Sequence, residues 1–93
     1  MPTLVATLRV KKDKVDEAKS FLKELATEVL ANEEGTLEYS LFQKQDEPEV
    51  FVLYERYASP EALAVHSKNL AAKGAGFAGI LDGRPDIMQL TSV

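Results

Sequence analysis

The pattern of apolar and polar residues is most distinctive at residues 50–57, where one predicted strand is apolar on both faces. Alternate residues of a strand point to opposite sides of a sheet. One face holds Phe51, Leu53, Glu55 and Tyr57, and the other holds Val50, Val52 and Tyr54. Because neither face is polar, this strand is expected to be covered on both sides.

The same kind of pattern predicts the other elements. Alternation of apolar and polar residues indicates strands, whereas spacings of three and four residues indicate amphipathic helices. Asp13 is expected to cap the first helix, and Ser59 followed by Pro60 is a strong start signal for the second. The predicted segments are a strand at 3–11, a helix ending near Asn32, strands at 36–44 and 50–57, a helix from 60 to about 69, a small-residue loop or short helical turn at 71–83, and a strand at 85–91.

The order of these elements predicts the fold class. Strand, helix, strand, strand, helix, strand is the ferredoxin-like α+β pattern, with an antiparallel four-stranded sheet and both helices on one face. A chain of 93 residues is expected to form a single domain over residues 1–93.

No predicted element remains to cover the far face of the sheet, which would carry Val5, Phe42 or its neighbours, Val50, Val52 and Tyr54. We therefore expect a homodimer in which two sheets pack face to face as an α+β barrel. The alternative is that these side chains are scattered surface apolar residues, as soluble proteins tolerate.

Composition narrows the range of partners. An apolar fraction of 45% and a charged fraction of 28% are ordinary for a globular domain and favour neither disorder nor a membrane span. The net charge of −4 is spread over both signs, so no basic stripe favours nucleic acid. The first residues are typical of a strand rather than a signal peptide, which favours a cytoplasmic protein.

The sequence contains no metal motif. It has one histidine and no cysteine, and the acidic runs DEPE and NEEG lie in predicted turns, where we expect them to be solvated. No metal is therefore expected.

Four runs of the chain match one known family. They are Glu34 and Gly35 before the second strand, LEYSLF at 37–42, FVLYERY at 51–57 and SPEALAVH at 59–66. With these runs the chain resembles the antibiotic biosynthesis monooxygenase family of dimeric α+β barrels. That family includes quinol-oxidising monooxygenases without metal or flavin, haem-degrading relatives and isomerase-like members, so the fold alone does not select the chemistry.

The chain also departs from the family. Tyr57 stands where members often carry tryptophan, and no second histidine soon follows His66. Compared with the haem-degrading branch, Ala6 replaces an asparagine, His66 replaces a tryptophan, and a glycine-rich segment stands where that branch has an iron-binding histidine. These differences argue against haem degradation.

The candidate catalytic residues are His66, Glu55 and Tyr57. His66 lies on the side of its helix that should face the sheet, and the resemblance implies that Glu55 and Tyr57 share the face opposite that helix. An imidazole can accept a phenolic proton, a carboxylate can fix its tautomer, and a phenol can donate to a substrate oxygen. The expected substrate contacts are Ala6, Leu53, Tyr39 and Phe77.

Each of these assignments has an alternative. A lone histidine beside an apolar stripe is often a packing residue, and Tyr39 and Phe77 are typical of a core. Glu55 could instead pair with Lys44, Arg9 or Arg56 at the edge of the sheet.

The resemblance thus implies a cofactor-independent enzyme, a monooxygenase that oxidises a small aromatic quinol or polyphenol with dioxygen. The glycine-rich segment at 71–83 would serve as a lid. Two alternatives stay open. One is a non-catalytic dimeric module that binds a small molecule, and the other is an isomerase or lyase that moves protons with His66 and Glu55.

Overall fold

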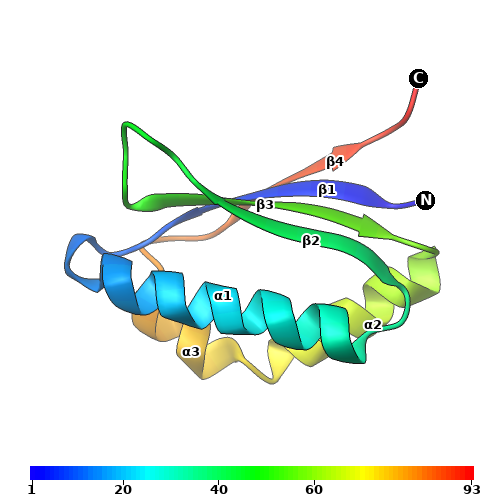
Figure 1. Ribbon diagram of the computed structural model, residues 1–93, viewed down its shortest axis with the longest axis horizontal. Coiled ribbons are helices and arrows are strands. Elements are labelled where there is room, and N and C mark those ends of the chain that lie inside the picture. The colour runs from blue at the N-terminus through cyan, green and yellow to red at the C-terminus, as the bar shows by residue number, and fades with distance from the viewer.

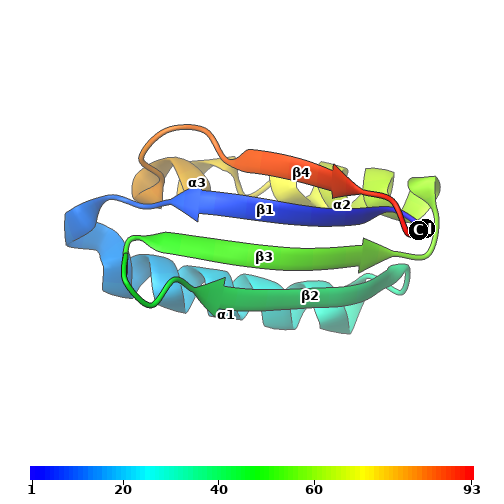
Figure 2. The same cartoon turned by 90° about the horizontal axis from the view of Figure 1, so that it is seen from above.

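The computed structural model describes residues 1–93 as a sheet with helices on one face (Figures 1 and 2). The strand order is β2-β3-β1-β4, and every neighbouring pair is antiparallel. This arrangement confirms the predicted α+β, ferredoxin-like class. The elements are β1 (Thr3–Arg9), the short 3₁₀ turn η1 (Lys12–Lys14), α1 (Val15–Asn32), β2 (Thr36–Gln43), β3 (Val50–Tyr57), α2 (Pro60–Ala71), α3 (Gly74–Ile80) and β4 (Asp86–Leu90).

The helix starts follow the sequence signals only in part. Ser59 caps α2 as predicted, because its Oγ accepts the backbone N–H of Ala62 at 3.1 Å. The prediction that Asp13 caps the first helix is wrong. Asp13 lies inside η1, which runs directly into α1, and Lys14 occupies the cap position without a side-chain bond. The small-residue segment contains the seven-residue helix α3, the helical version of the predicted loop or turn.

The apolar core lies mainly between α1 and the inner face of the sheet. Helix α1 contributes four buried side chains, whereas His66 is the only buried side chain of α2. The core cluster consists of Ala6, Leu8, Val10, Ala18, Leu22, Leu25, Val29, Tyr39, Phe51, Leu53 and Ile80. Helix α1 is therefore held on the sheet by apolar packing, whereas α2 combines the buried His66 with half-buried apolar residues such as Leu70.

The other face of the sheet has no helix over it (Figure 1). Strand register places Val5 between Tyr54 and Met88, and Val52 between Thr7 and Phe42. Phe42 is 57% exposed. We call Val5, Phe42, Val52, Tyr54, Met88 and Leu90 the open face.

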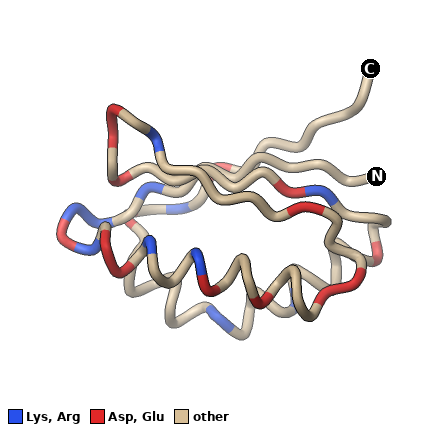
Figure 3. Tube along the Cα trace, viewed as in Figure 1, with Lys and Arg blue, Asp and Glu red and all other residues tan.

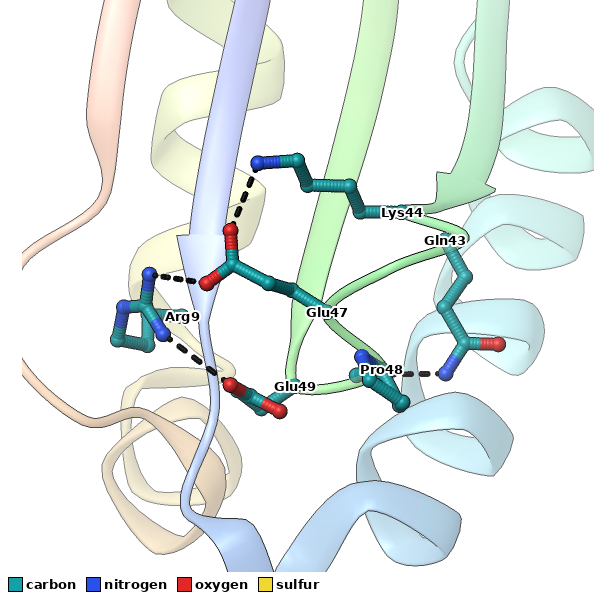
Figure 4. Close-up of polar contacts among 6 residues, drawn as sticks. All are labelled: Arg9, Gln43, Lys44, Glu47, Pro48 and Glu49. Atoms are coloured by element: carbon teal, nitrogen blue, oxygen red, sulfur yellow. Dashed lines mark hydrogen bonds and ion pairs between the residues drawn. The ribbon is translucent and has the colours of Figure 1, made fainter.

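Val50 was expected on this open face, but it is only 5% exposed. The β2–β3 loop rises on the side away from the helices (Figure 1), and its polar side chains gather at this end of the sheet (Figure 4). Arg9 binds Glu47 at 3.2 Å and Glu49 at 3.5 Å, and Lys44 binds Glu47 at 2.7 Å. The loop, which sequence periodicity does not describe, accounts for the burial of Val50.

Charges of both signs occur along α1 and the connecting segments (Figure 3). None of the helices combines the length and hydrophobicity needed to span a lipid bilayer.

Candidate functional site

All four polar or charged residues that the fold buries belong to one cluster between α2 and the sheet. They are Glu33, Thr36, Glu55 and His66. Tyr57, also fully buried, hydrogen-bonds to this cluster through Glu55. Buried ionisable groups are costly unless they are paired, and they gather at functional sites. Their convergence therefore marks the candidate site.

The imidazole of His66 is held on one side by Glu33. His66 Nδ1 lies 2.9 Å from Glu33 Oε1, and the Thr36 hydroxyl donates to the same oxygen at 2.9 Å. Asn69, one helical turn after His66, donates from Nδ2 to Glu33 Oε2 at 3.2 Å. Both oxygens of the Glu33 carboxylate are thus hydrogen-bonded.

The prediction that the NEEG run is solvated is wrong for Glu33, which is 8% exposed. Helix α1 ends at Asn32, and Glu33 is its C-cap residue, with its backbone N–H bonded to the Val29 carbonyl. The chain turns there toward β2, and the Glu33 side chain reaches His66 of α2.

On the other side of the imidazole lie Glu55 and Tyr57, two residues apart on β3 and therefore on one face. The Tyr57 hydroxyl donates to Glu55 Oε1 at 2.5 Å. His66 Nε2 lies 3.9 Å from the same oxygen, which is beyond hydrogen-bond distance. The three predicted catalytic residues are therefore brought together, while their roles stay a prediction.

Glu55 does not pair with Arg9, Lys44 or Arg56, as the alternative interpretation proposed. It points from an inner strand toward the helices, whereas Arg56 pairs with Glu38 and the other two cations bind the hairpin loop. Burial raises the pKa of the Glu55 carboxyl, and the bond from Tyr57 opposes this rise.

The two tyrosines around the imidazole both have raised pKa values. Burial raises the pKa of Tyr57, and the hydrogen bond to Glu55 raises it further. Burial also raises the pKa of Tyr39, with smaller contributions from the Glu55 and Glu33 charges. The ring centroids of Tyr39 and Tyr57 lie 5.0 Å and 5.3 Å from that of His66.

His66 Nε2 is buried and has no hydrogen-bond partner. Leaving a buried polar atom unpaired costs about 1–3 kcal/mol, and native structures contain few such atoms. The ring is thus anchored through Nδ1, whereas Nε2 has no partner within the folded chain.

The predicted substrate contacts divide into two groups. Tyr39 packs against His66. Ala6 and Leu53 are cross-strand neighbours in the buried core between the sheet and the helices. Phe77 instead packs edge-to-face on Phe21 at a centroid distance of 5.1 Å, between α3 and α1.

Two surface grooves lie near the cluster. A groove of about 270 Å³ between α1 and α2 is lined by Glu33 and Asn69, with the Glu28–Lys73 ion pair of 2.8 Å among its lining residues. A groove of about 990 Å³ at the end of the sheet is lined by Leu4 and Leu63, among others. His66 lines neither groove, so the protomer in this conformation encloses it.

No group of three or more His, Asp or Glu side chains is arranged to hold a metal ion.

Comparison with protein families gives a match to the antibiotic biosynthesis monooxygenase model over residues 1–75. The chain belongs to the antibiotic biosynthesis monooxygenase family. The matched region includes Glu33, Glu55, Tyr57 and His66. The resemblance inferred from sequence is thereby confirmed.

Solved structures place this family member among close structural relatives. A Caulobacter crescentus protein named for the same family is 36% identical, with a TM-score of 0.89 over 99% of this chain and 89% of that one. A Pseudomonas aeruginosa protein (23% identity, TM-score 0.88, 99% and 93% covered) shares the fold. So does one from Mycobacterium tuberculosis (22% identity, TM-score 0.86, 99% and 94% covered). No curated protein matches the chain.

Sequence reasoning missed three residues of the site in this family member: Glu33, Thr36 and Asn69. Two signals were present. Asn69 follows His66 by three residues, which places both on one helical face. Glu33 directly precedes Glu34 and Gly35, the first matched run.

Gly35 allows α2 to lie against the segment that carries Glu33. A Cβ at position 35 would lie 2.4 Å from Ala62 Cβ of α2. We expect Gly35→Ala to lower the free energy of unfolding by about 1–3 kcal/mol, as overpacking does, because α2 must move away. Urea denaturation measures this. Gly79→Ala, in α3, is the control, because its Cβ would meet nothing within 4 Å; an equal loss there would contradict the explanation.

Proposed function

We propose that this protein is a cofactor-independent monooxygenase that oxidises a small aromatic quinol or polyphenol with dioxygen. Family membership supports monooxygenase chemistry. The observation that carries the proposal is the imidazole of His66, anchored at Nδ1 and buried but unpaired at Nε2. Such a nitrogen is suited to accept a phenolic proton in a water-excluded site.

The proposed reaction begins when Nε2 removes the phenolic proton of the substrate. The electron-rich anion reduces dioxygen, and a carbon–oxygen bond forms at a ring carbon that carries hydrogen. The hydrogen of that carbon then moves as a proton to the distal peroxide oxygen while the O–O bond breaks. One oxygen atom remains as the carbonyl of a quinone. The other leaves as water, protonated by the His66 imidazolium, which restores the neutral ring.

The neighbouring groups support this proton cycle. A carboxylate at Glu55, 3.9 Å from Nε2, favours the positive charge that develops on the ring. Tyr39 and Tyr57 stay protonated because their pKa values are raised, so they serve as donors and not as competing bases. The substrate supplies the electrons, and the protein supplies orientation, a base and exclusion of water.

We also infer that two protomers pair through the open face. Its apolar residues extend across all four strands, and no element of the same chain covers them. A contiguous apolar face of this kind marks an interaction surface in a soluble protein, and a second copy of the sheet has the matching flat shape.

The proposed function is tested by oxygen uptake with menadiol and purified protein treated with a chelator. We expect oxygen consumption above the spontaneous rate, one atom of ¹⁸O from labelled dioxygen in the quinone, and the other in water. Hydrogen peroxide as the main product would indicate a simple oxidase instead. Conversion that continues without oxygen would favour an isomerase or lyase, and no turnover above background with a panel of quinols would contradict enzymatic oxidation.

A further inference from the structure

We propose that Glu33 is a positioning residue, which fixes the proton of the neutral His66 ring on Nδ1 and thereby makes Nε2 the basic nitrogen. The role of Nε2 as a base rests on the proposed function. The position of the proton is a separate property of the folded protein and can be measured without any substrate.

The hydrogen bonds around Glu33 support this assignment. Thr36 donates its hydroxyl to Oε1 and Asn69 donates its amide to Oε2, so two donors already converge on the carboxylate. An ionised carboxylate can only accept. The remaining neighbour at 2.9 Å, His66 Nδ1, must then carry the proton, because two acceptors would otherwise face each other.

The second carboxylate near the ring cannot play this part. Glu55 Oε1 is 3.9 Å from Nε2 and already accepts a hydrogen bond from Tyr57. In a neutral ring with the proton on Nδ1, Nε2 carries the lone pair and is the basic nitrogen. The sequence predicted that a carboxylate fixes the tautomer, with Glu55 as the candidate, and the geometry assigns that part to Glu33.

A buried carboxylate at Nδ1 has a second consequence for the reaction. When Nε2 takes up a proton, the ring becomes cationic, and the negative charge of Glu33 stabilises that cation at short range. Because Glu33 is 8% exposed, solvent screens this interaction weakly. Loss of the charge should therefore slow proton transfer more than it weakens substrate binding.

The chain contains one histidine, so protein labelled with ¹⁵N-histidine gives the imidazole signals of His66 alone. At a pH where the ring is neutral, long-range ¹H–¹⁵N spectra are expected to show Nδ1 protonated and Nε2 unprotonated. In Glu33→Ala, the ring should lose this preference and populate the Nε2-protonated form. Glu34→Gln, one residue away and exposed, is the matched control and should keep the wild-type spectrum.

Glu33→Gln separates charge from geometry. Its amide oxygen can still accept a hydrogen bond from Nδ1, so we expect the wild-type tautomer. Without the negative charge, kcat for quinol oxidation should fall by roughly 10- to 100-fold, as for other partners that orient a histidine. The KM should stay nearly constant. Circular dichroism and thermal unfolding check that each variant is folded. An Nε2-protonated ring in the wild type, or an unchanged tautomer in folded Glu33→Ala, would overturn the proposal whether or not the protein oxidises quinols.

Discussion

Replacing His66 with asparagine is expected to lower quinol-dependent oxygen consumption by about 10²- to 10⁴-fold, the range that positioned acid–base groups contribute. The asparagine amide can place an N–H near the position of Nδ1, so Glu33 keeps a donor. It has no basic nitrogen at the position of Nε2. Oxygen uptake at saturating menadiol measures the effect, and Ser67→Ala, an exposed neighbour on α2, is the control.

Asparagine is preferable to alanine at this position because alanine would leave the Glu33 carboxylate without its imidazole partner. Leaving a buried charged group without a hydrogen-bond partner costs about 1–3 kcal/mol or more, so His66→Ala could lose activity simply by unfolding. A folded His66→Asn variant that consumes oxygen as fast as the wild type would exclude His66 as the base, and the mechanism proposed above with it.

Replacing Val52 with aspartate is expected to convert a dimer into a monomer of 10.2 kDa. Val52 lies in the central strand β3 and on the open face, between Thr7 and Phe42. Two-fold symmetry would place two such charges in one apolar interface, at a cost of several kcal/mol. Each 1.4 kcal/mol raises the dissociation constant of the dimer about tenfold. Sedimentation at micromolar concentration measures the change.

The matched control for this experiment is Val65→Asp. Val65 is 53% exposed on α2, on the helical side of the molecule, so the same substitution there should leave the dimer intact. A wild-type protein that sediments as a monomer would refute pairing through the open face, and so would a Val52→Asp variant that remains dimeric.

The fold was predictable because its signals are local. Period-two and helical patterns, the Ser59 cap and Pro60 each report a short segment, and together they give the element order of the structure. The proximity of His66, Glu55 and Tyr57 was predictable from these patterns together with the family resemblance, which implied that Glu55 and Tyr57 face the helix of His66.

The features that sequence patterns did not predict depend on turns and on contacts between segments far apart in the chain. Glu33 is buried because the chain turns at the end of α1 and because Gly35 lets Ala62 approach, and neither feature has a periodic signature. Asp13 was wrongly taken as a cap because a 3₁₀ turn extends the helical structure beyond α1. Val50 is buried at the end of the sheet where ion pairs hold the β2–β3 loop, such as the one between Arg9 and Glu47.

His66 is the only buried side chain of α2, so the residue that would perform the chemistry is also the one that fastens its helix to the sheet. Raising α2 to admit a substrate would break the contacts of His66 and Asn69 to Glu33. The same motion would carry the base out of reach. Oxidation would then require α2 to close again over the bound substrate. The closed helix would keep bulk water away from the reactive anion.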